Sequence, residues 1–499
     1  MSGSSMYGNN HTYDVSIIGG GVVGSAIARE LSRYKLRCAL IEKEPDVAEG
    51  ISKANSGVLH AGFNVPPGSL KARFNIEGLS YFPDLADRLE VSTERCKKIV
   101  VAKTDGERNK LEELLEQGRT NGSTGLSIIG KSRISEVAPG VEGKWALYSE
   151  STGIINPFLF TLALAENAAI NGVDFFLGTE LSGITREHGP SGGFTLITSG
   201  GRRIYSRTVI NSAGMGSDRI ARMVEPDFPE KIYPCRGEYH IIDKEYSATL
   251  NTAVYPVPVK DGRSLGVHLT PTTNGNILFG PSAEYINSPE DTSTTQETME
   301  KLLNEAFELL PRLRGAGVIK SYAGIRPKLF TPQSGIHFKD FYIKESPHAP
   351  GFLNLVGIES PGLTASPAIA SYVVEQFVAS HLSLRRKENF ISTRKGIPRT
   401  AHLSREENNK LYLDDPEFAE ILCRCERISK GEIKRAIENP LGVRTLNGIK
   451  KRTYSMMGRC QSGFCLPRIA RILTDEYGIS PGEIKKSGDG SEIATGWME

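Results

Sequence analysis

Short apolar runs alternate with helically spaced apolar residues along much of the chain. This alternation predicts buried strands joined by amphipathic helices, as in a mainly parallel α/β sheet. The chain returns to that sheet from distant parts of its sequence. The predicted elements are strands over Tyr13–Ile18, residues 37–43, Val173–Leu177, Val209–Gly214 and Phe352–Gly357, with helices over residues 25–34 and Pro157–Asn171.

A period of two, broken by proline and glycine turns, distinguishes the middle of the chain. It predicts a separate antiparallel sheet followed by one helix. From about Leu384 to Phe418 the sequence is charged and interrupted by prolines, so we expect a linker that wraps the surface. The strand segments are Gly237–Asp243, Ala253–Pro258 and Leu265–Pro281, and the helix covers Thr294–Leu310.

A glycine-rich turn follows the first strand. Gly19, Gly21 and Gly24 have Gly-x-Gly-x-x-Gly spacing between a strand and a helix, and Glu42 ends the next strand. The glycines let the backbone turn tightly and approach a pyrophosphate at the helix N-terminus, and the carboxylate can accept a hydrogen bond from a ribose hydroxyl. This context predicts a Rossmann-like dinucleotide-binding domain.

Two further glycine-rich turns, at Gly214 and Gly357, follow later strands. A nicotinamide-dependent enzyme needs one nucleotide-binding unit and a substrate domain. Several glycine-rich turns at which the chain returns to the sheet suit a longer cofactor, so we infer FAD. The backbone amides of Gly362, Leu363 and Thr364 precede a predicted helix and could face the end of the flavin where negative charge develops. A plain turn with a helix cap is the alternative for this segment.

Charge and composition limit the classes of partner. The 499 residues include 60 Lys and Arg against 58 Asp and Glu, a net charge of +2. This balance leaves no chain-wide basic field of the kind that drives nucleic-acid binding. No stretch approaches the roughly 18 consecutive apolar residues that span a bilayer, and the first residues lack the features of a signal peptide. We therefore expect a cytoplasmic protein without a transmembrane segment.

Four separated segments resemble, in order, the cofactor segments of the D-amino-acid-oxidase-like (DAO) FAD oxidoreductases. They are IIGGGVVG at 17–24, NSGVLHAG at 55–62, VINSAGMGSD at 209–218 and LVGIESPGLTASPAIA at 355–370. The resemblance covers about residues 13–380 and is greatest to the branch of glycerol-3-phosphate and L-2-hydroxyglutarate dehydrogenases. It implies that the 55–62 loop lies beside the flavin, with Ser56 and Gly57 among the FAD contacts.

The expected fold is α/β, with a Rossmann-like FAD-binding domain, an inserted mainly antiparallel substrate-binding sheet and a small helical C-terminal domain. The expected boundaries are a flexible tail over 1–12, the oxidoreductase domain over 13–385 with substrate-binding parts at about 63–150 and 230–330, a linker over 386–418, the C-terminal domain over 419–478 and a tail over 479–499.

Histidine and arginine residues are the catalytic candidates. His60 lies between small residues in the 55–62 loop, and an imidazole can accept a hydroxyl proton as hydride leaves the adjacent carbon. A structural histidine is the alternative, and His268 is the second candidate. Arginine forks suit the anionic group of a substrate, so we expect Arg326 and Arg236 to bind it.

Four cysteines near the C-terminus form the candidate metal site. Cys423 and Cys425 are separated by one residue, and Cys460 and Cys465 by four. Four thiolates suit either a [2Fe-2S] cluster or zinc. The surrounding segments resemble the bacterioferritin-associated-ferredoxin-like [2Fe-2S] domain, which implies iron and sulfide. The other cysteines are expected to be buried apolar side chains, namely Cys38, Cys96 and Cys235.

The cysteine region is also strongly basic. Between Cys423 and Arg471 there are 12 Lys and Arg and 3 Asp and Glu, an excess of nine positive charges. This charge suits an anionic cluster and could attract an acidic electron partner. A nucleic-acid patch is the less favoured alternative, since no interleaved aromatic residues or recognition helix accompany it.

Together the two modules predict an FAD-dependent dehydrogenase for a small anionic alcohol. The resemblance implies oxidation of sn-glycerol 3-phosphate to dihydroxyacetone phosphate by hydride transfer to flavin, with electrons leaving through the cluster to an NAD(P)-linked flavoprotein or a quinone-linked acceptor. The alternatives are L-2-hydroxyglutarate, an amine substrate, or an electron-transfer or redox-sensing subunit without a substrate. A zinc-stabilised docking tail is a further alternative for the C-terminal domain.

Overall fold

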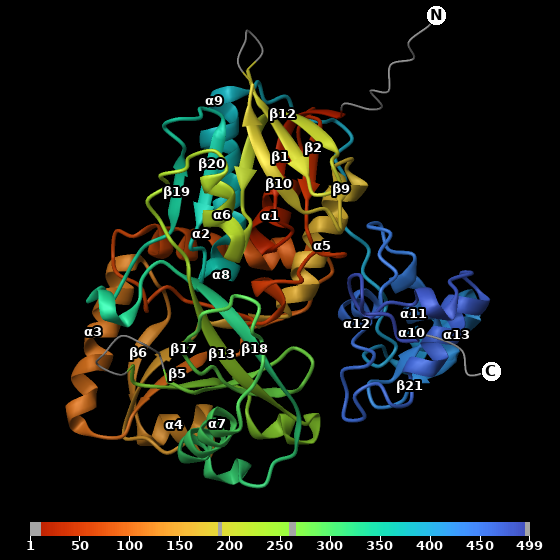
Figure 1. Cartoon of the computed structure of the whole chain (residues 1–499). Helices are drawn as coiled ribbons and strands as arrows, with labels where there is room; N and C mark the ends of the chain where they lie inside the picture. The colour runs from red at the N-terminus through yellow and green to blue at the C-terminus, as the bar shows by residue number, and fades with distance from the viewer. Residues whose placement is uncertain (1–10, 188–191, 259–265, 495–499) are drawn as a thin grey trace, which may run out of the picture.

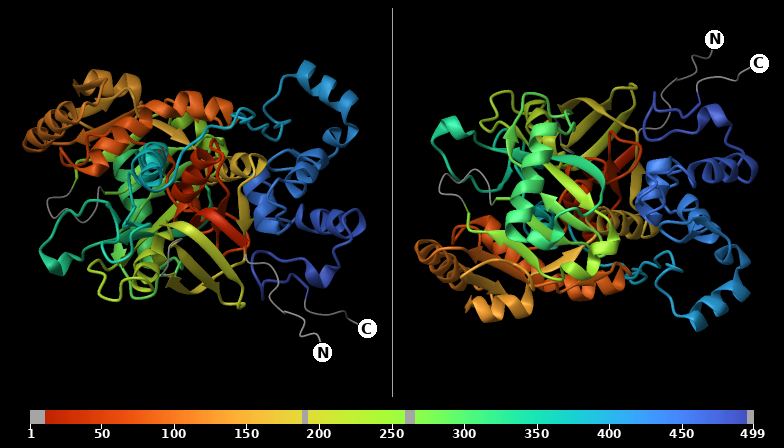
Figure 2. Two further views of the ribbon diagram at one scale, coloured as in Figure 1. Left: turned by 90° about the horizontal axis from the view of Figure 1, so that it is seen from above. Right: turned by 90° about the horizontal axis from the view of Figure 1, so that it is seen from below.

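Two large sheets and a small helical unit make up the computed structural model, which describes residues 11–187, 192–258 and 266–494. In Figure 1 the nucleotide sheet lies at the top, the second sheet at the bottom, and the C-terminal unit beside both. Figure 2 shows the C-terminal unit on one side of the main body in both further views. Most of the predicted N-terminal tail, residues 1–10, and the last part of the predicted C-terminal tail, residues 495–499, lie outside the described residues.

The nucleotide sheet has a parallel centre, as predicted. Strand β1 (His11–Ile18) lies between β12 (Arg203–Asn211) and β2 (Cys38–Ile41), and both neighbours run parallel to it. The chain also returns through β20 (Phe352–Val356), which pairs with β12 in parallel. Antiparallel strands extend one side, and they are β10 (Leu181–Arg186), β11 (Phe194–Thr198) and β19 (Tyr342–Glu345), while β9 (Asp174–Phe176) is a parallel edge.

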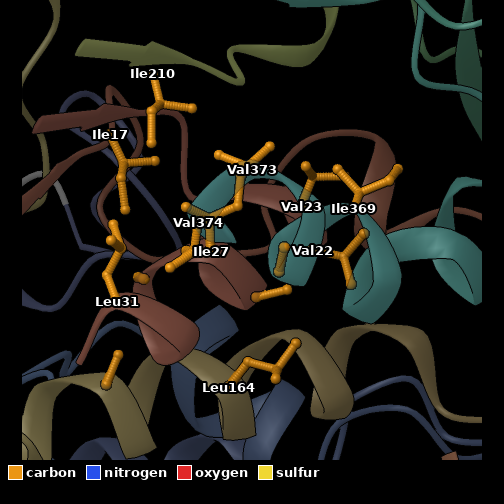
Figure 3. Close-up of a cluster of buried hydrophobic side chains, with 14 of the residues drawn as sticks. Ile17, Val22, Val23, Ile27, Leu31, Leu164, Ile210, Ile369, Val373 and Val374 are labelled. Atoms are coloured by element: carbon orange, nitrogen blue, oxygen red, sulfur yellow. The ribbon is translucent and has the colours of Figure 1, made fainter. Parts of the chain in front are cut away.

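Three apolar helices cover one face of this sheet. They are α1 (Val22–Leu31), α5 (Pro157–Ile170) and α8 (Gly362–Tyr372), which continues into a π-helical turn over Val373–Val378. Figure 3 shows their side chains together, with Ile27 of α1 close to Val374 and Leu164 of α5 below. Full burial of each such aliphatic side chain stabilises the fold by about 1.5–3 kcal/mol.

The second sheet is mainly antiparallel, as predicted. Its longest pairing joins β13 (Tyr233–Ile242) to β18 (Val318–Lys328). The order is β17-β13-β16-β15-β14-β5-β7-β6, with β18 beside β13. The remaining strands are β5 (Lys98–Ala102), β6 (Leu126–Gly130), β7 (Trp145–Ser149), β14 (Ala253–Pro256), β15 (His268–Pro271), β16 (Ile277–Gly280) and β17 (Glu284–Tyr285).

Segments 98–149 and 233–328 thus build one sheet, although α5 and half of the nucleotide sheet separate them in sequence. The sheet carries α3 (Asp105–Asn121), α4 (Lys131–Val137) and α7 (Gln296–Leu309). The predicted strand segment Leu265–Pro281 contains β15 and β16, and Leu265 itself lies outside the described residues. A three-stranded sheet of β3 (Val58–Leu59), β8 (Gly153–Ile155) and β4 (Thr93–Glu94) contributes the loop that carries His60.

The C-terminal unit is helical with one short hairpin. It contains β21 (Ile421–Cys423), β22 (Ile428–Ser429), α11 (Lys430–Ile437), α12 (Leu446–Thr453) and α13 (Leu466–Asp475). Ile484, which falls in the predicted tail, is 2% exposed and packs in the core of this unit. The tail therefore helps to build the unit.

The segment before this unit differs from the predicted surface linker. It contains a helix, α10 (Arg405–Asp414), that begins with a capping box at Ser404 and Glu407. Arg394 is 5% exposed, and its Nε donates to Glu166 Oε2 of α5 at 2.6 Å. Most of segment 386–418 is exposed or partly exposed, as its charge and proline content indicated, and the buried ion pair fixes it to the nucleotide domain.

Candidate active site and thiolate site

The glycine turn after β1 leaves no room for side chains. Gly19 has a φ of +104°, and a Cβ there would lie 2.5 Å from the Ser212 carbonyl oxygen. A Cβ at Gly24 would lie 2.0 Å from the Gly19 carbonyl oxygen, and Gly21 is the N-cap of α1. Glu42 Oε2 accepts a hydrogen bond from the Gly20 amide at 2.5 Å. This backbone cradle at a helix N-terminus fits the pyrophosphate of a dinucleotide.

The other predicted cofactor segments converge on the same end of the nucleotide sheet. Gly214 and Gly357 have φ values of +55° and +71° after β12 and β20. Gly362 and Leu363 begin α8, and Gly57 has a φ of +68° in the loop that also holds Ser56.

Thr364 ties α8 to the loop that carries His60. Its Oγ1 accepts a hydrogen bond from the His60 amide at 3.0 Å and lies 3.4 Å from the Val58 carbonyl. A Cβ at Gly78 of α2 (Leu70–Arg88) would lie 2.1 Å from the Thr364 carbonyl oxygen, so α2 packs directly on α8. The position of His60 is thus set by the first turn of α8.

His60 is held at its backbone, and within the described residues its ring has one neighbour at hydrogen-bonding distance. Asn75 Nδ2 donates to the His60 carbonyl at 2.8 Å, and the Ser360 hydroxyl lies 3.3 Å from His60 Nε2. Burial, together with the positive charge of Lys98, lowers the pKa of His60 to about 3. The imidazole is therefore neutral at physiological pH and can accept a proton, but so low a pKa makes it a weak base.

Arg326 lies on β18 opposite Cys235 of β13. Its Nη2 donates to the Ser282 carbonyl at 2.5 Å, and its buried Nε has no hydrogen-bond partner in the described part of the chain. A Cβ at Gly237 would lie 2.8 Å from Nη2, so the glycine makes room for the guanidinium. Burial alone would lower the pKa of Arg326, but the neighbouring Cys235, Tyr239 and Glu359 raise it.

Two lysines share one carboxylate near Arg326. Lys71 Nζ lies 3.0 Å from Glu359 Oε1, and Lys328 Nζ lies 2.8 Å from Glu359 Oε2. Burial would raise the pKa of Glu359, but the two ammonium groups hold it at about 2. Three cations around one carboxylate leave an excess positive charge, which suits an anionic ligand.

Arg236 does not join this group, contrary to the prediction. Neighbouring residues of a strand point to opposite faces, so Arg236 points away from the face that carries Cys235 and Arg326. Three carboxylates surround its guanidinium, with nitrogen–oxygen distances of 2.6 Å to Glu284, 2.9 Å to Asp291 and 3.4 Å to Glu238. These ion pairs make it a structural residue.

His268 packs behind the His60 loop and not in the site itself. Its ring stacks on Tyr255, with ring centroids 3.5 Å apart and an interplanar angle of 11°. On the other side of Tyr255 lies Lys98 Nζ, 4.4 Å from that ring and 4.3 Å from the ring of Phe63. His268 is therefore part of a buried stack next to the His60 loop.

Sequence reasoning overlooked Lys98 and Glu359. Lys98 is 1% exposed, and its Nζ has no hydrogen-bond partner among the described residues. A lysine at the start of the apolar run KIVVA was the available signal for Lys98. For Glu359 the signal was a carboxylate directly after the turn at Gly357.

The four C-terminal cysteines lie on two neighbouring loops. Cys423 ends β21, and Cys465 is the N-cap of α13. The Sγ atoms of Cys423 and Cys425 are 3.8 Å apart, and those of Cys425 and Cys460 are 3.7 Å apart. Thiolates on one tetrahedral ion with bonds of about 2.3 Å lie roughly 3.8 Å apart, so these spacings fit shared metal ligation.

The described side chains at the thiolate site do not form a complete ligand set for a single metal ion. Within the described residues, no three His, Cys, Asp or Glu side chains have a complete metal-binding arrangement. A [2Fe-2S] cluster has two irons and takes four thiolates, so these four cysteines could hold it. The other cysteines are buried elsewhere, as predicted, and they are Cys38, Cys96 and Cys235.

The thiolate unit contacts both large sheets through ion pairs. Lys451 pairs with Glu49 near the glycine turn at 2.8 Å. Arg459 pairs with Asp243, directly after β13, at 3.0 Å. The unit therefore has contacts with the nucleotide sheet and with the second sheet.

Comparisons with known proteins match both parts of the chain. Residues 14–376 match the family model described as FAD dependent oxidoreductase, and residues 421–475 match the BFD-like [2Fe-2S] binding domain. The chain is 41% identical to the glycerol 3-phosphate dehydrogenase of Caloramator mitchellensis, over 97% of this chain and 98% of that protein. It is 32% identical to the mitochondrial L-2-hydroxyglutarate dehydrogenase of Caenorhabditis elegans, over 73% and 93%.

Among solved structures, the chain is similar to the L-α-glycerophosphate oxidase of Mycoplasma pneumoniae with FAD bound. The TM-score is 0.69 at 30% identity, over 77% of this chain and 98% of that one. No helix within residues 11–187, 192–258 and 266–494 has the length and apolar character needed to cross a bilayer.

Proposed function

This chain belongs to the FAD-dependent oxidoreductase (DAO) family and carries a BFD-like [2Fe-2S] domain, and we propose that it oxidises sn-glycerol 3-phosphate to dihydroxyacetone phosphate. The single observation that carries the choice of substrate is the 41% identity, over nearly the whole length of both chains, to a glycerol 3-phosphate dehydrogenase. When bound, FAD supplies a hydride acceptor and the cluster a one-electron carrier through which electrons leave.

His60 is the proposed general base. Because its ring is neutral, Nε2 can accept the proton of the substrate hydroxyl as hydride leaves the same carbon. Thr364 and Asn75 hold the backbone of His60 on both sides, which orients the imidazole. The Ser360 hydroxyl, 3.3 Å from Nε2, can donate to that nitrogen and so favour the tautomer with its hydrogen on Nδ1.

Arg326 is the proposed binding residue for the phosphate. Its Nε is buried without a partner among the described residues, and a phosphate oxygen would satisfy that donor. Lys71 and Lys328, which Glu359 neutralises only in part, add to the positive potential for a dianion.

The predicted division into an oxidoreductase domain over 13–385 and a C-terminal domain over 419–478, and the cytoplasmic location, stay predictions.

L-2-hydroxyglutarate is the second candidate substrate. It is favoured by the 32% identity to an L-2-hydroxyglutarate dehydrogenase over nearly all of that protein. A dicarboxylate also suits a cationic pocket, so charge alone does not separate the two substrates.

The test is an anaerobic titration of the purified holoenzyme. We expect glycerol 3-phosphate to bleach the visible flavin absorbance, and L-2-hydroxyglutarate at equal concentration to leave it unchanged. Bleaching by L-2-hydroxyglutarate alone would assign the second substrate. Absence of bleaching by either would refute both and favour an amine substrate or an electron-transfer subunit. His60→Gln, with unchanged flavin content, is expected to slow flavin reduction by about 10²–10⁴-fold.

A further inference from the structure

A basic surface with one exposed aromatic ring lies beside the cysteines. Phe464 directly precedes Cys465 and is 64% exposed, although a phenylalanine is normally buried. Arg468 and Arg471 follow at helical spacing on α13 and are exposed, while Ile469, Ile472 and Leu473 face the core. We call Ile421, Arg424, Phe464, Arg468 and Arg471 the exit face.

In the described part of the chain, six of the 12 Lys and Arg side chains between Cys423 and Arg471 form ion pairs. These pairs include Lys451 with Glu49 and Lys434 with Glu417. On the exit face, by contrast, Arg424, Arg468 and Arg471 form no ion pair in the described part of the chain. Arg468 Nη1 donates a hydrogen bond to the Ile421 carbonyl at 3.4 Å. These three charges are free to attract a partner.

A hollow of about 440 Å³ adjoins the exit face. Arg468 and Arg471 line it together with Leu422, Pro467 and Ile472, and its carboxylates are Glu420, Asp475 and Glu476. Glu476 is bound by Lys430 at 2.8 Å and Lys434 at 3.1 Å. The hollow gives the face a concave, partly apolar contact area, as in transient protein interfaces.

The cysteines are unequally shielded. Cys423 and Cys465 are buried, whereas Cys425 and Cys460 are partly exposed. Cys460 precedes Phe464 by four residues, so the partly exposed cysteine and the exposed ring belong to the same short segment. Arginine and phenylalanine are both enriched in protein interfaces, and a rim of unpaired arginines speeds encounter with an acidic surface.

We propose that the exit face docks an acidic protein that accepts one electron at a time. This inference rests on the proposed exit of electrons through the C-terminal domain. Each encounter transfers one electron: the enzyme loses it, the acceptor gains it, and no bond or proton changes hands. Phe464 is the central apolar contact, and the arginines orient the partner by charge.

The test uses cytochrome b5, an acidic haem protein, and cytochrome c, a basic one, as probes. The holoenzyme is reduced with dithionite, which is then removed, so that the transfer does not depend on any substrate. We expect faster haem reduction with cytochrome b5, and a rate that falls as salt is added. Arg468→Glu/Arg471→Glu should slow that rate at low salt by about tenfold or more. Phe464→Ala should slow it at every salt concentration.

Arg119→Glu, an exposed charge reversal on distant α3, is the matched control and should have no effect. Calorimetric binding of oxidised cytochrome b5 at low salt gives a second readout, and we expect it to persist in Arg119→Glu and to disappear in the double variant. Equal rates for wild type and double variant, or faster transfer to cytochrome c, would overturn the proposal. So would binding to phosphatidylserine vesicles that the double variant loses while its transfer to cytochrome b5 is unchanged.

Discussion

Arg452 of α12 and Glu166 of α5 are joined by a 2.8 Å contact between Nε and Oε1, with side chains 1% and 3% exposed. Arg452 Nη1 also lies 2.8 Å from Asp46 Oδ2, and Arg394 binds the other oxygen of Glu166. Burial alone would lower the pKa of Arg452, but Asp46 and Glu166 raise it. Arg452 thus holds the C-terminal unit against the nucleotide domain together with Lys451, which pairs with Asp46 at 3.1 Å and Glu49 at 2.8 Å.

Replacing Arg452 with methionine should weaken the contact between the C-terminal unit and the nucleotide domain. The change leaves Asp46 without its nearest partner, and breaking a buried ion pair costs about 3–5 kcal/mol. We expect a separate, lower-temperature unfolding transition in calorimetry and faster proteolysis of segment 386–418. Arg119→Met, which removes an exposed pair with Glu116, is the control and should change stability by less than about 1 kcal/mol. A single unchanged transition in Arg452→Met would contradict the expected role.

Lys98→Met should change the pH dependence of flavin reduction. Burial lowers the pKa of Lys98 to about 7, and its positive charge lowers the pKa of His60. Below about pH 7 the ammonium opposes proton transfer to His60, so the rate should rise through neutral pH in the wild type. In Lys98→Met this inflection should disappear, as measured by anaerobic stopped-flow absorbance. Lys97→Met, an exposed neighbour, should keep it.

The same substitution should stabilise the protein at neutral pH. An unfolded lysine has a pKa of about 10.4, so between pH 7 and 10 the unfolded chain binds more protons and stability rises with pH. The cost of the buried ammonium is therefore fully present below pH 7 and fades towards pH 10. We expect Lys98→Met to have a higher melting temperature at pH 7 and a flatter pH dependence. A lower melting temperature at pH 7 would show that Lys98 stabilises the fold.

Local signals account for what the sequence predicted well. The strand, glycine turn, helix and second strand around Gly19–Glu42 are contiguous, and the cysteine pairs are separated by one and four residues. Arg236 was misassigned because a strand places neighbouring residues on opposite faces, and the register of β13 depends on its pairing with β18. Glu166 and Arg452 lie 286 positions apart, so only the packed structure reveals their contact.

Arg326 and Arg236 offer a matched comparison of two arginines on adjacent strands. Arg326→Met should weaken binding of glycerol 3-phosphate by about 1.5–3 kcal/mol, roughly 10–100-fold, because a charge-assisted contact is lost. Arg236→Met should leave binding unchanged and lower the melting temperature, because Glu284, Asp291 and Glu238 lose their shared cation. The measurements are flavin-absorbance titration and calorimetry. Weaker binding in Arg236→Met with intact stability would reverse the assignment.

Cys460→Ser should separate substrate oxidation from electron exit. Its Sγ lies 3.7 Å from that of Cys425, so a serine there removes one thiolate from the shared site. The visible absorbance of an iron–sulfur cluster should be lost or altered, while glycerol 3-phosphate still bleaches the flavin, since His60 and Arg326 lie in other elements. Cys235→Ser, a buried cysteine outside the thiolate site, is the control and should keep the cluster absorbance. Zinc without iron in anaerobically purified wild-type protein would contradict the expected result and favour a structural tail.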